Sequence, residues 1–94
     1  MTEAAIQKKI INMLEKEYGA YVVKVIVASK SGVPDILCSI DGTFVGIEVK
    51  RPESKSNVSK LQEYNLSKIE ESLGKSMVAW NTDMVRDFIE SEVL

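Results

Sequence analysis

Two carboxylates and a lysine near the middle of the chain have the types and the spacing that could hydrolyse a phosphodiester. Asp35 begins one apolar run, and Glu48 and Lys50 lie two residues apart in the next one. Carboxylate oxygens are the ligands that Mg²⁺ prefers, and a bound metal ion polarises a phosphoryl oxygen and lowers the pKa of a water. A lysine beside it could orient that water, assist its deprotonation or stabilise the developing charge. The sequence leaves these three roles of Lys50 open.

A two-residue turn determines how these side chains meet. The dipeptide at 41–42 is Asp-Gly, a strong hairpin signal between apolar runs, and it predicts strands over 35–40 and 43–50. Counting back from this turn places Asp35 directly opposite Glu48, with Cβ atoms about 4.5–5.5 Å apart. Two carboxylates at that distance destabilise a sheet unless a positive charge lies between them, and a divalent metal is the obvious candidate.

The two faces of this hairpin have different patterns. Side chains two apart on a strand share a face, so Lys50 lies beside Glu48, while Gly46 opposes Leu37 and is expected to leave space near the carboxylates. Each charged residue taken alone is more often part of a solvated surface, and the bare spacing arises easily by chance. The register match and the lysine on the same face favour a functional site. The other face is expected to form the core, with Ile36, Cys38, Ile40, Val45, Ile47 and Val49.

The rest of the sequence predicts the elements that hold this hairpin. Helical spacing, capping residues and β-branched runs give the order αβββαβα. This order predicts an α/β fold in a single domain, 1–94, with one mixed sheet. The elements outside the hairpin are a helix over 3–18 between a Thr2 cap and Gly19, a strand over 20–28, loops over 29–34 and 51–58, a helix from about 60 to 73 ended by Gly74, a strand over 75–80, and a helix from 82 to about 92 capped by Thr82.

The composition excludes several other kinds of chemistry. The 94 residues include no histidine, which removes Ser-His-Asp triads, histidine-based nucleases and the usual zinc catalysts. Cys38 is the only cysteine, so an internal disulfide is impossible, and a core position is expected for it. The net charge of −2 counts mildly against a passive nucleic-acid binder, although bound Mg²⁺ would offset carboxylates locally. No apolar stretch reaches the length of a membrane span, so we expect a soluble, intracellular protein.

Two stretches of the sequence resemble the signature of VRR-Nuc domains, a branch of the PD-(D/E)xK nucleases. They are Gly-Val-Pro-Asp-Ile-Leu at 32–37 and Gly-Ile-Glu-Val-Lys-Arg-Pro at 46–52. The resemblance covers nearly the whole chain, including the acidic residue of the first helix and the Leu-Gln pair at 61–62. It implies a restriction-endonuclease-like αβββαβ core, with a mixed central sheet flanked by helices and an additional C-terminal helix.

The resemblance also implies a metal site. Mg²⁺ or Mn²⁺ would be bound by Asp35, Glu48 and the backbone carbonyl of Val49, with Lys50 at the position of the catalytic lysine. Glu3 matches the family's acidic residue that completes the metal environment. The alternative for Glu3 is a first-turn glutamate that only interacts favourably with the helix dipole.

A glutamine near the active site is a further implied feature, and Gln62 matches it. Ser59-x-x-Gln62 is also a capping box, in which Gln62 would only close the start of its helix. Gly32 is expected to supply a backbone conformation before Pro34 rather than chemistry. Trp80 is expected in the core or in a dimer interface rather than as a base-stacking platform, and the last helix is expected to pack mainly on the core. Five basic residues are candidate phosphate contacts, namely Lys24, Lys30, Arg51, Lys55 and Lys60.

Stand-alone members of this family, often from phages and bacteria, resemble Holliday-junction resolvases and act as dimers. The expected function is therefore a Mg²⁺-dependent endonuclease that cuts branched DNA as a homodimer in the cytoplasm of a bacterial or phage-infected cell. Two symmetric cuts need two sites, which a two-fold dimer supplies. The alternatives are a flap or nicking nuclease and a non-catalytic nucleic-acid-binding module. The presence of Asp35, Glu48 and Lys50 argues against the last alternative.

Overall fold

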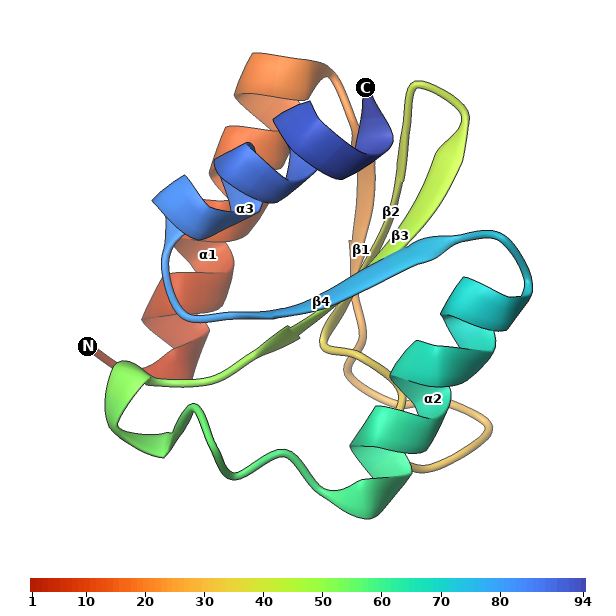
Figure 1. Ribbon diagram of the computed structural model, residues 1–94. Helices are drawn as coiled ribbons and strands as arrows, with labels where there is room; N and C mark the ends of the chain where they lie inside the picture. The colour runs from red at the N-terminus through yellow and green to blue at the C-terminus, as the bar shows by residue number, and fades with distance from the viewer.

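The predicted hairpin forms the centre of a four-stranded sheet (Figure 1). The computed structural model describes residues 1–94. Strands β2 (Ile36–Ile40) and β3 (Thr43–Val49) are antiparallel, and Ile40 pairs with Thr43 as the two-residue turn requires. Both turn residues have positive φ, 50° at Asp41 and 84° at Gly42, which suits the right-handed twist of a hairpin. The predicted register is confirmed.

The sheet is mixed and runs in the order β1-β2-β3-β4. Strand β1 (Tyr21–Lys24) is antiparallel to β2, whereas β4 (Lys75–Ala79) is parallel to β3. A strand followed by a helix can return parallel to the first strand, and α2 (Lys60–Glu71) makes that connection between β3 and β4.

The predicted first strand, 20–28, is too long. Strand β1 ends at Lys24, which pairs with Ile36, the first residue of β2. One more ladder hydrogen bond follows, from the Val25 N–H to the Asp35 carbonyl at 2.8 Å. Beyond it the chain has no partner strand, and Ile26 and Val27 are 77% and 89% exposed. The β-branched side chains therefore do not extend the strand, because strand formation depends on a neighbour as well as on propensity.

Helices cover both faces of the sheet (Figure 1). Helices α1 (Glu3–Tyr18) and α3 (Thr82–Phe88) lie on one face, and α2 packs on β3 and β4 from the other. A π-helical turn, η2 (Ile89–Val93), continues α3. None of the helices combines the length and apolar character that a membrane span requires.

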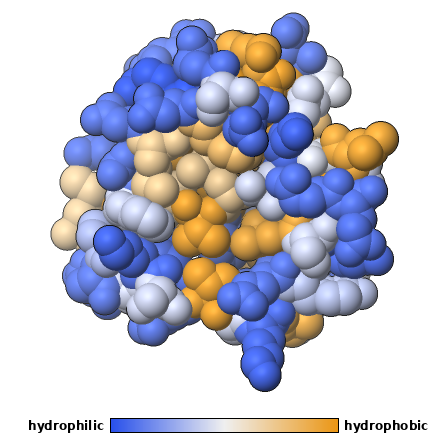
Figure 2. All heavy atoms as spheres, in the orientation of Figure 1, coloured by the Kyte–Doolittle hydropathy of each residue, from blue (hydrophilic) through white to orange (hydrophobic).

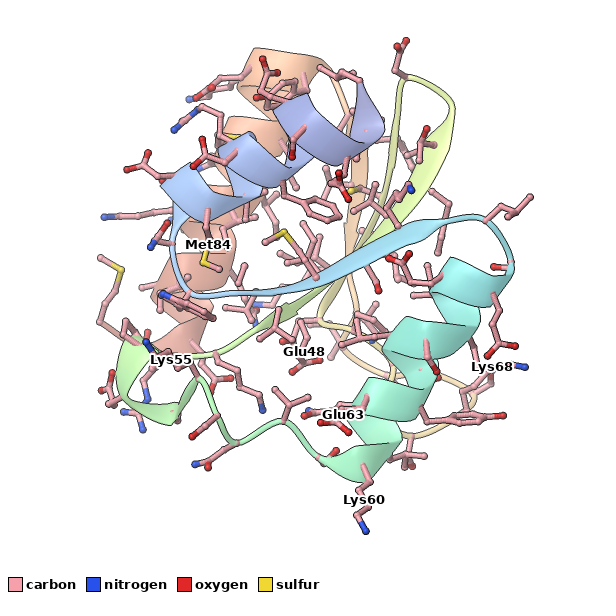
Figure 3. All side chains as sticks on the ribbon, in the orientation of Figure 1. Glu48, Lys55, Lys60, Glu63, Lys68 and Met84 are labelled. Atoms are coloured by element: carbon pink, nitrogen blue, oxygen red, sulfur yellow. The ribbon has the colours of Figure 1, made fainter.

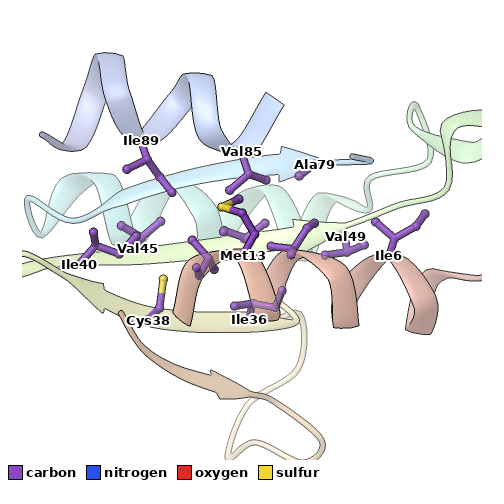
Figure 4. Close-up of a cluster of buried hydrophobic side chains, with 13 residues drawn as sticks. Ile6, Met13, Ile36, Cys38, Ile40, Val45, Val49, Ala79, Val85 and Ile89 are labelled. Atoms are coloured by element: carbon purple, nitrogen blue, oxygen red, sulfur yellow. The ribbon is translucent and has the colours of Figure 1, made fainter. Parts of the chain in front are cut away.

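The hydrophobic core lies between the sheet and the helices α1 and α3 (Figure 4). The six residues predicted from the hairpin pattern all belong to it, and none of them is more than 3% exposed. Burial raises the pKa of the Cys38 thiol to about 11, as expected for a buried cysteine without a charged partner. The core residues are Ile6, Ile10, Met13, Leu14, Ile36, Cys38, Ile40, Val45, Ile47, Val49, Ala79, Val85 and Ile89.

The predicted helix start and end are confirmed for α1. The Thr2 hydroxyl accepts a hydrogen bond from the Ala5 N–H at 3.1 Å, and Gly19 ends the helix with a φ of 60°. For α3 the predicted cap is wrong by one residue. Asn81 caps the helix by accepting from the Met84 N–H at 2.8 Å, and an asparagine is as good an N-cap as the threonine that follows it.

The end of α2 also differs from the prediction. The helix ends at Glu71, and Leu73, not Gly74, has the left-handed conformation, with a φ of 73°. Position 74 favours glycine because of close packing, since a Cβ there would lie 2.8 Å from Ile69 Cγ2 and 3.0 Å from the Phe44 carbonyl oxygen. Leu73 therefore has a strained backbone conformation that a glycine would adopt without steric cost.

Strand β4 is the second edge of the sheet. Its first four residues are half-buried, and only Ala79 is fully buried. Figure 2 shows apolar side chains gathered in the middle of the face that β4 crosses, with hydrophilic residues around them. The loop after β3 contains a short 3₁₀ turn, Pro52–Ser54, and passes below this face (Figure 1).

Candidate active site

Asp35 and Glu48 face each other where the β2–β3 ladder ends. Ile36 pairs with Ile47, so Asp35 and Glu48 occupy the next position outward. The Asp35 Oδ2 atom accepts a hydrogen bond from the Val49 N–H at 2.8 Å. Glu48 is 3% exposed, and Asp35 is half-buried. Strand pairing therefore holds one carboxylate of the pair in the protein interior beside the other.

The pair has the electrostatics of a cation site. Burial raises the pKa of Glu48 to about 8, and the charge and hydrogen bond of Asp35 raise it in the same direction. The charge of Lys50 lowers the pKa of Glu48, and the charge of Glu3 raises it. Burial and a neighbouring like charge both disfavour an ionised carboxylate. A divalent cation between the two groups would remove this penalty.

Lys50 completes the predicted constellation. Its Nζ atom lies 3.8 Å from Glu48 Oε2, and its side chain is 13% exposed. The Lys50 N–H donates to the Ala79 carbonyl at 3.0 Å, which attaches the end of β3 to the end of β4. Figure 3 shows Glu48 pointing into the space between the sheet and the first turns of α2. Two carboxylates and an ammonium group therefore share one partly enclosed site.

Gln62 forms the predicted capping box and also contacts Glu48. Its Oε1 atom accepts from the Ser59 N–H at 3.0 Å, and the Ser59 hydroxyl accepts from the Gln62 N–H at 3.1 Å, which is a complete capping box. Its Nε2 atom donates to Glu48 Oε2 at 3.1 Å. Because Oε1 accepts from a backbone N–H, the NH₂ group of the Gln62 side chain remains to donate to the Glu48 carboxylate. The start of α2 is thus connected directly to the candidate site.

Glu3 is less closely associated with the carboxylate pair. It is half-buried in the first turn of α1, and its charge contributes to the raised pKa of Glu48. No three histidine, cysteine, aspartate or glutamate side chains in the chain lie close enough together to hold a metal ion. The donor set that could hold a metal is therefore Asp35 and Glu48, with the Val49 carbonyl next in the chain. This set suits Mg²⁺, which commonly uses one or two carboxylates together with waters and substrate phosphates.

The comparisons with known proteins agree with this architecture. A solved structure described as a "VRR_NUC domain" superimposes with a TM-score of 0.78 and covers 96% of this chain and 96% of its own. The chain has the fold of a VRR-Nuc domain. The sequence identity to that structure is 24%, so the likeness concerns the fold. No family model and no curated protein matches the sequence.

Within the VRR-Nuc fold, Gly46 does not leave the space that its opposition to Leu37 suggested. A Cβ at position 46 would lie 2.6 Å from Ile69 Cδ1 and 3.2 Å from Pro34 Cγ. The space is therefore filled by α2 and by the residue before Asp35, and that part of the prediction is wrong. The glycine instead lets α2 pack close against β3 beside the site.

Asn65 is a buried polar residue of α2 that the sequence analysis missed. It is 8% exposed, and its Nδ2 atom donates to the Ser31 carbonyl at 3.0 Å and to the Leu61 carbonyl at 2.9 Å. Gly32 has a φ of 82°, and a Cβ there would lie 2.8–2.9 Å from Leu61 and Asn65. The conformational role predicted for Gly32 is confirmed. The hydrogen bond from Asn65 attaches the segment that leads to Asp35 to helix α2. A polar residue one turn after Gln62 was the available signal.

Gln7 is a second buried polar residue that the sequence analysis missed. It is 8% exposed and lies one turn after Glu3 in α1, next to core residues. Its spacing from Glu3 was the available signal, since residues four apart share a helix face.

The five basic residues predicted to contact phosphates are all exposed. Lys24 ends β1, Lys30 lies in the segment before Asp35, and Lys60 begins α2. Arg51 follows Lys50 directly, and its Nη1 atom lies 3.7 Å from Glu53 Oε2. The remaining residue is Lys55, whose Nζ atom lies 5.1 Å from the centroid of the Trp80 ring.

Trp80 does not belong to the hydrophobic core. It is half-buried at the end of β4, and it lines a surface cavity. The expected core position is therefore wrong. The last helix behaves as expected, because Val85 and Ile89 are fully buried and Met84 and Phe88 pack against the core.

Proposed function

We propose that this protein is a divalent-metal-dependent DNA endonuclease. The observation that carries the proposal is the opposition of Asp35 and Glu48, one of them buried with a raised pKa, with the Lys50 ammonium 3.8 Å away. A strongly perturbed carboxylate beside a second carboxylate and a lysine is typical of functional sites. The shared fold with a solved VRR_NUC domain supports the same assignment.

The proposed cofactor is Mg²⁺, with Mn²⁺ as a substitute, held by Asp35, Glu48 and the Val49 carbonyl. When bound, the ion supplies an acidified water and offsets the negative charge of the phosphodiester. Lys50 is placed to hold the attacking water or to stabilise the charge that develops on the phosphoryl oxygens. Gln62 orients Glu48 through the 3.1 Å hydrogen bond to Oε2. Glu3 adds negative charge near the ion, and the five basic residues contact DNA phosphates.

The proposed substrate is branched DNA, and Holliday junctions in particular, in the cytoplasm of a bacterial or phage-infected cell. Resolution of a four-way junction requires two symmetric cuts, and one chain of 94 residues carries one candidate site. A homodimer with two-fold symmetry would supply the second site.

An uncovered part of the sheet provides a surface for the second copy. Tyr21 and Phe44 flank Ser39 in one row across β1, β2 and β3, and Val23 pairs with Leu37 in the next row. Helix α2 packs on the β3–β4 side of this face, so Tyr21, Val23 and Phe44 stay 76%, 43% and 46% exposed. Contiguous apolar residues beside an unpaired edge strand are typical of association surfaces.

The experiment that tests the activity compares four end-labelled DNAs: a four-way junction, a flap, a linear duplex and a single strand. Each is incubated with Mg²⁺, Mn²⁺ or EDTA. We expect paired, metal-dependent cuts in the junction, no cleavage by Asp35→Asn and strongly slowed cleavage by Lys50→Ala. Preferential cutting of the flap would replace the junction by a flap substrate. No cleavage by folded wild-type protein, with DNA still bound, would favour the non-catalytic binding module.

The dimer is tested separately by light scattering of the eluting protein. Val23→Lys places a charge in the uncovered face, and we expect it to convert the dimer into a monomer. Lys8→Glu, on the exposed surface of α1, is the matched control and should leave the dimer intact. A wild-type protein that elutes as a monomer at all concentrations would remove the dimer from the proposal.

A further inference from the structure

A surface cavity of about 340 Å³ lies beside the candidate active site. It is formed by the first turns of α1, the turn after β3 and the segment that joins β4 to α3. Its volume lies in the range of small-molecule sites, about 300–1,000 Å³. The residues that matter for its chemistry are Ile6, Lys9, Pro52, Trp80, Asn81 and Thr82.

The cavity is close to the catalytic strand end because β3 and β4 are parallel. The carboxyl ends of parallel strands meet at one edge of a sheet, and here the Lys50 N–H donates to the Ala79 carbonyl at 3.0 Å. Trp80 follows Ala79, and Pro52 follows Lys50 by two residues. The cavity therefore begins two residues after the proposed catalytic Lys50. On the neighbouring strand it begins directly after Ala79, the hydrogen-bond partner of Lys50.

The cavity lining combines an aromatic ring with groups that suit a nucleotide. Trp80 is half-buried, and the Lys55 Nζ atom lies 5.1 Å from its ring centroid without lining the cavity. Lys9 contributes a positive charge, and Asn81 uses Oδ1 for the α3 cap, which leaves its amide NH₂ for other partners. The one acidic lining residue, Glu53, is paired with Arg51 at 3.7 Å.

We propose that this cavity binds one base of the DNA strand that flanks the cleaved phosphodiester. The base stacks on Trp80, and Lys9 and Lys55 contact the neighbouring phosphates. The inference rests on the proposed nuclease function, because it takes the DNA of the active site as the occupant. Aromatic stacking is tolerant of sequence, since every base presents a π-face, so the subsite would fix the position of the strand without reading its sequence.

The chain offers a direct test because Trp80 is its only tryptophan. The Asp35→Asn variant, which is expected not to cut, is titrated with a four-way junction and with a single-stranded oligonucleotide while tryptophan emission is followed. We expect quenching that saturates with DNA binding. Binding without any change in Trp80 emission would overturn the subsite.

A set of variants separates stacking from folding. Trp80→Ala should weaken DNA binding by about 5- to 100-fold, the usual range for a lost stacking contact, and should raise KM with little change in kcat. Trp80→Phe keeps a ring and should restore most of the affinity. The control is Tyr64→Ala, which removes an exposed ring that also lies under a lysine, with Lys68 Nζ 6.0 Å from the centroid.

The outcomes also distinguish this inference from the proposed function. If the wild-type protein cleaves DNA while Trp80→Ala leaves affinity and KM unchanged, the proposed nuclease function is retained and the proposed subsite is rejected. If Tyr64→Ala weakens binding as much as Trp80→Ala, the effect is not specific to the cavity, and the subsite falls as well. Saturable quenching by DNA in a wild-type protein that cuts no substrate would support the subsite and remove the nuclease.

Discussion

The two faces of the central hairpin are built in opposite ways. Towards α1 and α3, the side chains of β2 and β3 are apolar and at most 3% exposed, apart from the half-buried Thr43 beside the turn. Towards α2, β3 presents Gly46 and Glu48, and Lys50 follows directly after the strand. The packed helix contributes Gln62 and Asn65. Strand alternation makes each residue of β3 belong to one of these environments. The apolar face fixes the strand, and that rigidity allows the other face to hold two carboxylates at close range.

The largest expected effect is a loss of stability on the apolar face. Ile47→Ala removes a fully buried side chain that pairs with Ile36, and it should lower the free energy of unfolding by about 2–5 kcal/mol. Urea denaturation measures the change. Ser39→Ala, at an exposed position of the same hairpin, should stay within about 0.5 kcal/mol of the wild type. A similar loss for both variants would mean that the two faces do not differ as described.

The polar face should show the reverse, a loss of activity with little loss of stability. Lys50→Ala should lower the cleavage rate about 10²- to 10³-fold, the usual effect of removing one charge-stabilising donor. The midpoint of thermal unfolding should change little. Lys68→Ala, which removes an exposed lysine paired with Glu71 at 3.2 Å, is the control and should cleave at the wild-type rate in a single-turnover assay.

The polar face should also make the stability of the protein depend on pH. Glu48 has a folded pKa of about 8, raised from 4.5, so the folded state holds a proton that the unfolded state releases. In EDTA, stability from this group is full below about pH 4.5 and declines towards pH 8, by up to about 1.4 kcal/mol per pH unit. Glu48→Gln should flatten this decline in denaturation curves recorded at several pH values. An unchanged slope in Glu48→Gln would assign the titration to another group.

Asn65 tests the connection between α2 and the segment before Asp35. Asn65→Ala leaves the Ser31 carbonyl without its side-chain donor, and the free energy of unfolding should fall by about 1–3 kcal/mol. Cleavage should fall as well, because the segment that positions Asp35 is loosened. Ser67→Ala loses only a 2.7 Å hydrogen bond to the Tyr64 carbonyl within the same helix, and it should cleave normally.

The smallest predicted effect lies outside both faces. Leu73 has a left-handed backbone and is 88% exposed. Leu73→Gly should raise the free energy of unfolding by about 0.5–1 kcal/mol, because glycine adopts this conformation without steric cost. Cleavage should not change. A destabilised Leu73→Gly protein would show that the leucine side chain makes a contribution that its exposure does not reveal.

Local features of the sequence predicted much of the site. The Asp-Gly turn determined the hairpin register, and the register placed Asp35 opposite Glu48 and Lys50 beside it. Thr2 and Gly19 determined the limits of α1 for the same reason, since turns and caps depend on residues a few positions apart.

Features that depend on distant residues were not predictable in the same way. The length of β1 is limited by where β2 begins, and the space beside Gly46 is filled by Ile69 from α2. Trp80 was expected in the core or in a dimer interface, but its position at the surface depends on how α1, the turn after β3 and the start of α3 meet around it. Neither spacing nor propensity carries information about such contacts.

The capping box of α2 has a consequence for motion. Gln62 joins the first turn of the helix to Glu48 through one side chain, so fraying of that turn and release of the carboxylate are a single local unfolding event. Amide hydrogen exchange at Ser59 and Gln62 would then report how often Gln62 releases Glu48. A ligand that bridges the two carboxylates should slow exchange at these helix amides, although it does not touch them.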